Sequence, residues 1–448
     1  MADEHYASIR TTYIALGAIE DAREVSERTG TDAGPSMTLA AGLRRWFLQP
    51  PRPHGEVIED RTVSSLELFY DLVYVVLVAQ IAHTLAEDVS WSGVLDFAVV
   101  FGLIWIGWFN GTQFHELHGR EDGRNRSLIF LQMGILAVLA VFAGHAASTD
   151  GEPFAITYAI LLAVLLCQWA TVYRTDSPEY RPGAFRYLIG LVISIAAMLA
   201  SSGMGDSGRL AVWAAIVVGS VALVVFYILR TSDESLGIRA THSMAERYGL
   251  FIIIVLGEVV FGVVDGLAGV DDLDLRTVAT GVLGLSIAFG FWWTYFDYVG
   301  RRLPRQDGGS LVLWLYSHLP VAAAVAAAGA GMVSLIEHAA DARTPEPSSW
   351  LLAGSVAALL VTLVATMFSL ADYRERPALY RPLGMALPLG AAAALAIGWA
   401  RPAPWLLATL LDAILIAIWT YAFALTLRTR DAPESRPLIA RSRSELHS

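Results

Sequence analysis

The sequence predicts an all-α integral membrane protein with about twelve transmembrane helices, arranged as two parallel six-helix repeats. The first observation is composition: 55% of the 448 residues are hydrophobic and 16% are charged, and the mean hydropathy is +0.52. This balance is typical of membrane proteins rather than soluble ones. The second observation is a series of long apolar runs, and the third is a set of motifs that recur along the two halves.

Twelve apolar runs are long enough to cross the hydrocarbon layer, which takes roughly 20 helical residues. The runs are continuously apolar rather than alternating, and a helix satisfies its own backbone hydrogen bonds in lipid, so helices are favoured over strands. The predicted spans are 66–86, 94–114, 127–147, 153–173, 184–201, 210–230, 243–265, 277–299, 311–335, 349–371, 383–400 and 405–427.

Arginines in the connections predict the orientation, because short cytoplasmic loops carry an excess of basic residues. The connections after even-numbered spans hold thirteen arginines, counting Arg230 at the end of the sixth span, and those after odd-numbered spans hold four. All 31 basic residues are arginine, which is typical of a GC-rich bacterial genome. We therefore expect a multi-pass protein of the bacterial cytoplasmic (inner) membrane with both termini in the cytoplasm.

The segments outside the spans are polar and carry mixed charges. Residues 1–65 are expected to form a largely flexible cytoplasmic tail, residues 231–242 a cytoplasmic linker, and residues 428–448 a cytoplasmic C-terminal tail. Met1 and Met37 are both candidate start positions.

Recurring motifs predict an internal duplication. Tyr173-Arg174 and Tyr180-Arg181-Pro182 recur 200 residues later as Tyr373-Arg374 and Tyr380-Arg381-Pro382, and Gly190 recurs as Gly390. The first repeat would cover residues 66–230 and the second 243–427. Because six spans are an even number, both repeats would have the same orientation, with a cavity between the halves. Helix-end preferences of Arg and Trp are the competing explanation.

Charged residues inside spans are candidates for function, since each costs roughly 2.5–3.5 kcal/mol at mid-membrane on insertion scales. Glu67 and Asp71 are four residues apart and share a helix face, and close like charges suit proton binding. The alternative is that they cap the helix N-terminus and pair with arginine.

The seventh span carries Glu246, Arg247 and Glu258. Arg247 and Glu258 lie about three turns apart on one face, and Glu258 is the deepest acid. It is either a proton- or ion-linked site or a neutral, hydrogen-bonded structural residue. Asn110, Asp297 and His318 complete the set of transport or ion-binding candidates, although His318 could equally link two helices by hydrogen bonds.

Several chemistries are missing from the sequence. No phosphate-binding glycine loop, nucleophile elbow or zinc-protease motif is present, so no catalytic residue and no cofactor is predicted. The single cysteine, Cys167, excludes an intramolecular disulfide and a site of paired cysteines, and no metal site is predicted. A net charge of -11 argues against nucleic-acid binding.

Three motifs carry a resemblance: Glu67-Leu-Phe-Tyr-Asp71-Leu-Val-Tyr-Val75, Glu246-Arg-Tyr-Gly-Leu-Phe251 through Leu256-Gly-Glu258, and Trp292-Trp-Thr-Tyr-Phe-Asp297. In these motifs the chain resembles the bacterial low temperature requirement A family, over roughly residues 60–427. The resemblance implies a multi-pass membrane protein linked by name to growth in the cold. A looser likeness is to potassium and proton channels whose first helix opens with Phe-Ser-Asp, where this chain has Phe69-Tyr70-Asp71.

We therefore expect a secondary transporter or an ion (proton or cation) pathway that uses intramembrane acids. An intramembrane enzyme acting on a lipid-linked substrate and a non-catalytic membrane scaffold or sensor for growth in the cold stay open as alternatives. The expected partners are the lipid bilayer and an ion or small solute, and a homodimer is compatible with this interpretation.

Overall fold

The computed structural model of the protein describes residues 46–47, 49–56, 61–120, 122–230, 240–270 and 273–430. In that part of the chain thirteen α-helices, α3 to α15, are defined and no strand is present. Twelve of these helices are long and apolar enough to cross a membrane, so the predicted all-helical fold with twelve spans is confirmed. Most of the N-terminal tail, the linker and the C-terminal tail lie outside the described residues.

Six long helices form each half of the chain. The first half consists of α3 (Ser65–Glu87), α4 (Trp91–His118), α5 (Gly123–Ala143), α6 (Gly151–Thr175), α7 (Arg181–Ser202) and α8 (Asp206–Arg230). The second half consists of α9 (His242–Ala268), α10 (Leu275–Tyr298), α11 (Gly308–Glu337), α12 (Glu346–Ser369), α14 (Pro377–Ala400) and α15 (Pro404–Arg430), with the short α13 (Asp372–Glu375) before α14.

Several helices begin before the apolar run that predicts them, because polar residues stabilise their first turns. Asp122 accepts a hydrogen bond from the Asn125 backbone at 2.7 Å, so α5 begins at Gly123 rather than at the predicted residue 127. Pro182 occupies the first turn of α7, where the missing N–H carries no penalty. Hydropathy therefore locates the spans but misses their capped ends.

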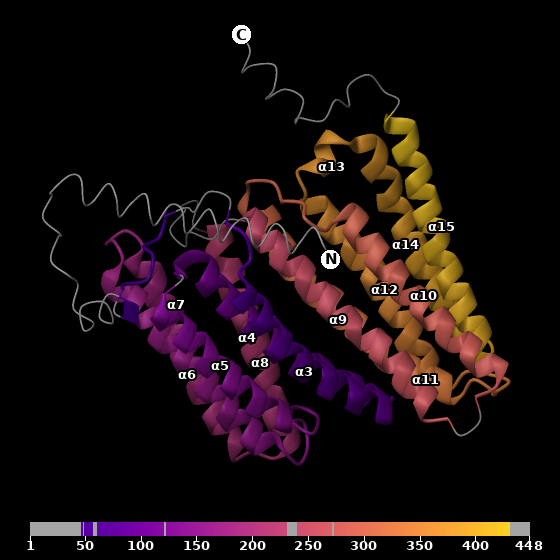
Figure 1. Ribbon diagram of the computed structural model, residues 1–448, viewed down its shortest axis with the longest axis horizontal. Helices are drawn as coiled ribbons and strands as arrows, with labels where there is room; N and C mark the ends of the chain where they lie inside the picture. Colours follow the sequence, from indigo (N-terminus) through magenta and orange to yellow (C-terminus); the bar gives the residue numbers. More distant parts are fainter. Residues whose placement is uncertain are drawn as a thin grey trace, which may run out of the picture. The chain divides into compact units, whose positions relative to one another are not determined.

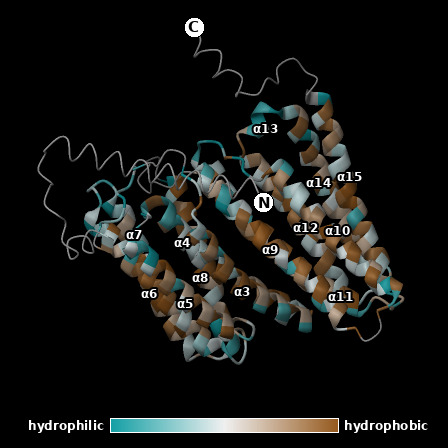
Figure 2. Cartoon of the chain, viewed as in Figure 1, coloured by the Kyte–Doolittle hydropathy of each residue, from teal (hydrophilic) through white to brown (hydrophobic). Residues whose placement is uncertain are grey.

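Hydrophobic residues are frequent along the middle of the long helices, and hydrophilic residues are frequent in the connections (Figure 2). Helix α11 is the most enclosed of the twelve spans, since 78% of the residues in its most apolar part are buried inside the protein. Many large apolar side chains elsewhere are exposed, including Phe130 at 75% and Val141 at 72%. On a helix of this hydropathy such residues face lipid rather than water.

The same helix pairs contact each other in both halves. The pairs α3·α4, α3·α5, α5·α6, α6·α7, α7·α8 and α4·α8 correspond to α9·α10, α9·α11, α11·α12, α12·α14, α14·α15 and α10·α15. This is the pattern that an internal duplication predicts, and the duplication itself stays an inference. Helix α3 contacts both α9 and α11 across the halves, and α3 and α9 run side by side in Figure 1.

The segment before α3 adds a polar contact to the end of α4. Arg52 is 3% exposed and donates a hydrogen bond from Nε to the Gly119 carbonyl at 2.7 Å. The Arg52 carbonyl is 2.7 Å from His118 Nδ1. A guanidinium at this position satisfies carbonyl groups that the helix C-terminus leaves without partners.

Candidate functional site

A buried ion pair connects the first span of each half. Arg247 on α9 donates a hydrogen bond from Nη2 to Oδ1 of Asp71 on α3 at 2.7 Å, and both side chains are fully buried. Trp108 on α4 donates from Nε1 to the same oxygen at 2.8 Å. Among the described residues, Oδ2 of Asp71 and Nε and Nη1 of Arg247 have no hydrogen-bond partner. The site thus combines a paired charge with polar atoms that still have bonding capacity.

Glu67 lies one turn before Asp71 and closes the N-terminus of α3. Its carboxylate accepts from the Ser64 backbone at 3.1 Å, and the Ser64 hydroxyl accepts from the Glu67 backbone at 3.3 Å, which is a capping box. Arg61 forms an ion pair with Glu67, and Arg247 Nη1 lies 3.9 Å from it. The contacts that the capping alternative requires are therefore present at Glu67.

Glu116 extends this charged site to the start of α9. Its carboxylate forms an ion pair with Arg61 and accepts hydrogen bonds from the Ser243 hydroxyl at 2.8 Å and the Thr241 hydroxyl at 2.6 Å. Thr241 also caps α9 by accepting from the Met244 backbone. Arg61 and Glu116 were not among the residues selected from the sequence, because one lies outside the spans and the other near the end of one.

Ionisable residues continue along α9 at helical spacing. Glu258 lies eleven residues after Arg247 and Asp265 seven residues after Glu258, so the three share one stripe about 27 Å long. Arg247 pairs with Asp71 of α3 at one end of the stripe, and Asp265 lies 3.8 Å from His83 of α3 at the other.

Glu258 is the acid with the fewest polar partners on this stripe. It is 6% exposed, and within the described part of the chain it makes no hydrogen bond and no ion pair. The helix backbone at this point is closely packed, since a Cβ added to Gly329 of α11 would lie 2.9 Å from the Glu258 carbonyl oxygen. The hydrogen bonds expected of a structural glutamate are therefore not seen at this carboxylate.

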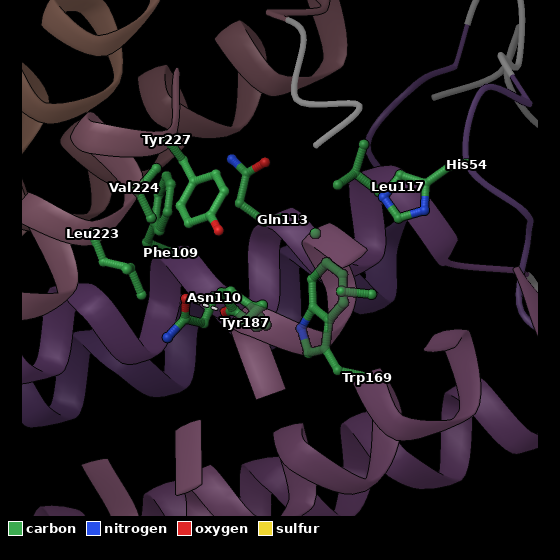
Figure 3. Close-up of a pocket in the computed structure, with 12 residues that line it drawn as sticks. His54, Phe109, Asn110, Gln113, Leu117, Trp169, Tyr187, Leu223, Val224 and Tyr227 are labelled. Atoms are coloured by element: carbon green, nitrogen blue, oxygen red, sulfur yellow. Dashed lines mark hydrogen bonds between the residues drawn. The ribbon is translucent and has the colours of Figure 1, made fainter. Parts of the chain in front are cut away.

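The remaining predicted residues separate into buried and exposed groups. His318 is buried and uses both ring nitrogens: Nδ1 lies 2.6 Å from the Trp314 carbonyl and Nε2 lies 3.1 Å from the Tyr295 hydroxyl. Glu246 and Asp297 are exposed on their helices. Asn110 accepts a hydrogen bond from Tyr187 of α7 (Figure 3). The structure thus brings Glu67, Asp71 and Arg247 together, and leaves Glu246, Asp297 and Asn110 outside their contacts.

Two buried polar contacts were not anticipated. Tyr70 of α3 donates to Gln132 of α5 at 2.9 Å, and Gln132 donates to Gln168 of α6 at 2.8 Å. On the other side of the protein, Ser286 of α10 donates to Asp412 of α15 at 2.9 Å, and Asp412 is 7% exposed. The apolar periodicity gives no warning of Asp412, but a search for every acid within a span would have found it.

In the described residues, no three His, Cys, Asp or Glu side chains lie close enough together to bind a metal ion. His115 packs against Tyr70 with ring centroids 5.8 Å apart, and His118 packs against Trp169 at 5.1 Å. Both histidines thus pack against aromatic rings, and His118 is also within hydrogen-bond distance of the Arg52 carbonyl.

Comparison with known proteins gives one family and one relative. The model of the bacterial low temperature requirement A protein (LtrA) family matches residues 62–424. An uncharacterized protein of Rhizobium meliloti (strain 1021) is 29% identical over 283 residues, which cover 58% of this chain and 67% of that protein. No solved structure matches the chain.

Proposed function

We propose that this chain, which belongs to the bacterial low temperature requirement A family, is a secondary transporter or ion pathway of the bacterial cytoplasmic membrane. The proposed route follows the contact between α3 and α9, and the transported species is a proton, a cation or a small solute coupled to one. Both termini would lie in the cytoplasm, as the arginines of the connections predict.

The observation that carries this proposal is Glu258. A carboxyl group within a transmembrane helix is energetically costly to insert into the membrane. Such residues usually pair with another side chain, line a water-filled cavity or bind a transported ion. Glu258 has no hydrogen bond or ion pair among the described residues to offset this cost. A cation or proton bound at this carboxylate would provide the missing compensation.

The Asp71 and Arg247 pair supports a gating role at one end of the same stripe. Both side chains are fully buried, so an ion could pass this point only if the pair opened. Movement of one half against the other would separate α3 from α9 and expose the pair, as alternating access between two repeats requires. The unpartnered Oδ2 of Asp71 then offers a second carboxylate oxygen to a cation.

The test is proton and potassium flux into proteoliposomes that contain the purified full chain. Wild type is compared with Glu258→Gln and Asp71→Asn, and Asp412→Asn serves as the matched control. Asp412 is also a buried acid within a span, but it lies in the contact between α10 and α15. Thermal unfolding and size-exclusion profiles establish that each variant is folded.

We expect flux in wild type and in Asp412→Asn, and loss of flux in Glu258→Gln. Wild-type flux in folded Glu258→Gln would remove the acid from the pathway. Absence of flux in the wild type under every imposed proton or potassium gradient would overturn the ion pathway itself, and would direct the search toward organic solutes.

A further inference from the structure

The first half contains an apolar cavity between α4, α6, α7 and α8. Its volume is about 390 Å³, and its lining includes Ile106, Tyr158, Leu191, Ser194 and Ile216. This is within the size range of small-molecule sites, which are mostly apolar with a few polar groups. The cavity is separate from the ion pair between α3 and α9, since none of the charged residues of that site lines it.

A smaller cavity of about 50 Å³ adjoins the large one. The two share five lining residues, which are Phe109, Asn110, Tyr187, Leu223 and Val224. Polar and aromatic residues are frequent among those that line the smaller cavity, and Figure 3 shows Asn110, Gln113, Trp169 and Tyr227 around it. The combined space therefore has a large apolar part and a small end, called the polar end below, where residues with polar atoms are more frequent.

The polar end lies at the level of the helix ends. Gln113 is near the end of α4, Trp169 near the end of α6, Tyr187 near the start of α7 and Tyr227 near the end of α8. The large cavity extends from there toward the middle of the spans. This is the depth profile of a membrane lipid, whose head lies at the interface and whose chain lies in the hydrocarbon layer.

Two buried polar atoms at the polar end have no hydrogen-bond partner among the described residues, although the Gln113 amide nitrogen donates to the sulfur of Met244 at 4.0 Å. Gln113 is 4% exposed and its Oε1 accepts no hydrogen bond, and Trp169 is 6% exposed and its Nε1 donates none. Unpaired buried polar groups are rare in proteins and indicate a missing ligand or water. One group is an acceptor and the other a donor, which is the combination that hydroxyl groups satisfy.

We propose that this cavity binds one neutral lipid with a single hydrocarbon chain and a hydroxyl-bearing head, the chemistry of a monoacylglycerol. The chain fills the apolar part, and the head hydroxyls bond to Gln113 and Trp169 once rotation of these side chains turns their buried polar atoms toward the cavity. A neutral head is required because no Asp, Glu or Arg side chain is among the described residues that line the two cavities. His54, which does line the polar end, contacts the Asp176 carboxylate through its Nδ1.

The cavity lies next to α7 and α8, the two spans that are most exposed to the membrane. Helices α7 and α8 are the two least enclosed spans. Only 22% and 11% of the residues in their most apolar parts are buried inside the protein. Ile193 of α7 lines the cavity and is 62% exposed, so the cavity reaches the outer face of the helix. A lipid can therefore enter sideways from the bilayer without crossing water.

The second half has less space at the position that corresponds to Gly190. Gly190 lines the large cavity, and a Cβ added there would meet only the end of Leu223, at 3.2 Å. At Gly390, which lies at the matching position of α14, an added Cβ would lie 2.7 Å from Ile418 and 3.2 Å from Ile414. The lipid site is accordingly expected in the first half.

The test is photolabelling of the full chain in phosphatidylcholine nanodiscs with a monoacylglycerol that carries a diazirine in its chain. Two variants block the site: Gly219→Phe puts a ring into open space at the cavity wall, and Gln113→Leu removes the acceptor. Gly134→Phe is the control, since this exposed glycine of α5 also has nothing within 4 Å of an added Cβ and lies outside the cavity lining.

We expect labelled peptides from α7 and α8, and a decrease of roughly fivefold in Gln113→Leu, the effect of about one hydrogen bond. Gly219→Phe should lower the same labelling, and Gly134→Phe should leave it unchanged. Equal labelling in wild type and Gly219→Phe would overturn the site. Displacement of the probe by a fatty acid carboxylate or by phosphatidylglycerol as effectively as by unlabelled monoacylglycerol would overturn the neutral head.

Discussion

Asp71 of α3 and Arg247 of α9 form a fully buried ion pair, with 2.7 Å between Oδ1 and Nη2, that connects the two halves of the protein. Trp108 donates a further hydrogen bond to the same oxygen. Loss of one member of a buried pair leaves a charge without compensation, whereas loss of both removes the charges together. Comparison of the two single variants with the double variant therefore measures the interaction within the pair apart from the contacts with other neighbours.

The first prediction concerns stability. Asp71→Asn and Arg247→Gln should each lower the free energy of unfolding in mixed micelles by about 3–5 kcal/mol, the usual result of breaking a buried pair. The double variant should lose much less than the sum of the two single losses. Additive losses would contradict the pair, because each residue would then be stabilised by other neighbours.

The sequence predicts the span architecture well because lipid imposes a strong and simple requirement. A run of about 20 apolar residues has few alternatives to a transmembrane helix, and all twelve predicted runs correspond to helices. The start of α5 at Gly123 was missed because Asp122 stabilises that end by a hydrogen bond rather than by hydropathy.

The candidate site was predictable only in part. Asp71 and Arg247 attract attention because charge within an apolar run is rare, yet their contact depends on how α3 packs on α9. The role of Glu116 depends on Ser243 and Thr241, which are about 125 residues away along the chain. Such long-range partners cannot be derived from local spacing, since one sequence gives no information on which helices pack together.

The second prediction concerns the close contact of α9 with α11. A Cβ added at Gly262 would lie 2.5 Å from the Gly329 carbonyl oxygen, whereas one added at Gly257 has nothing within 4 Å. Gly262→Ala should therefore lower the free energy of unfolding by about 1–3 kcal/mol, as overpacking does. Gly257→Ala, on the same helix, should be neutral or slightly stabilising. Equal unfolding temperatures for the two variants would contradict this prediction, because they would show that α9 and α11 can move apart without loss of stability.

The third prediction concerns acid pH at the start of α11. Ser310 donates hydrogen bonds to Asp307 from its backbone and its hydroxyl, and these bonds hold the pKa of the Asp307 carboxyl below its usual range. A carboxyl with a lowered pKa in the folded state stabilises that state at neutral pH, and the stabilisation is lost as pH falls through the folded pKa.

Hydrogen exchange can measure this effect against a matched variant. Below about pH 4, amides of the first turn of α11 should exchange faster in wild type than in Asp307→Asn, because Asn caps a helix at every pH. At pH 7 the two proteins should exchange at similar rates. The comparison at each pH cancels the intrinsic pH dependence of exchange, and a wild type that stays as protected as the variant in acid would refute the assignment.

The fourth prediction concerns the orientation of the spans, which rests on the arginines of the connections. In a Cys167→Ser background, Ser177→Cys lies between α6 and α7 and Gly205→Cys between α7 and α8, and both positions are exposed. A maleimide that cannot cross membranes should label Gly205→Cys in intact spheroplasts, and Ser177→Cys only after permeabilisation. The reverse pattern would place both termini outside the cytoplasm, and the polar end of the lipid cavity would then face the outer leaflet, since Ser177 lies at that same end of the helices.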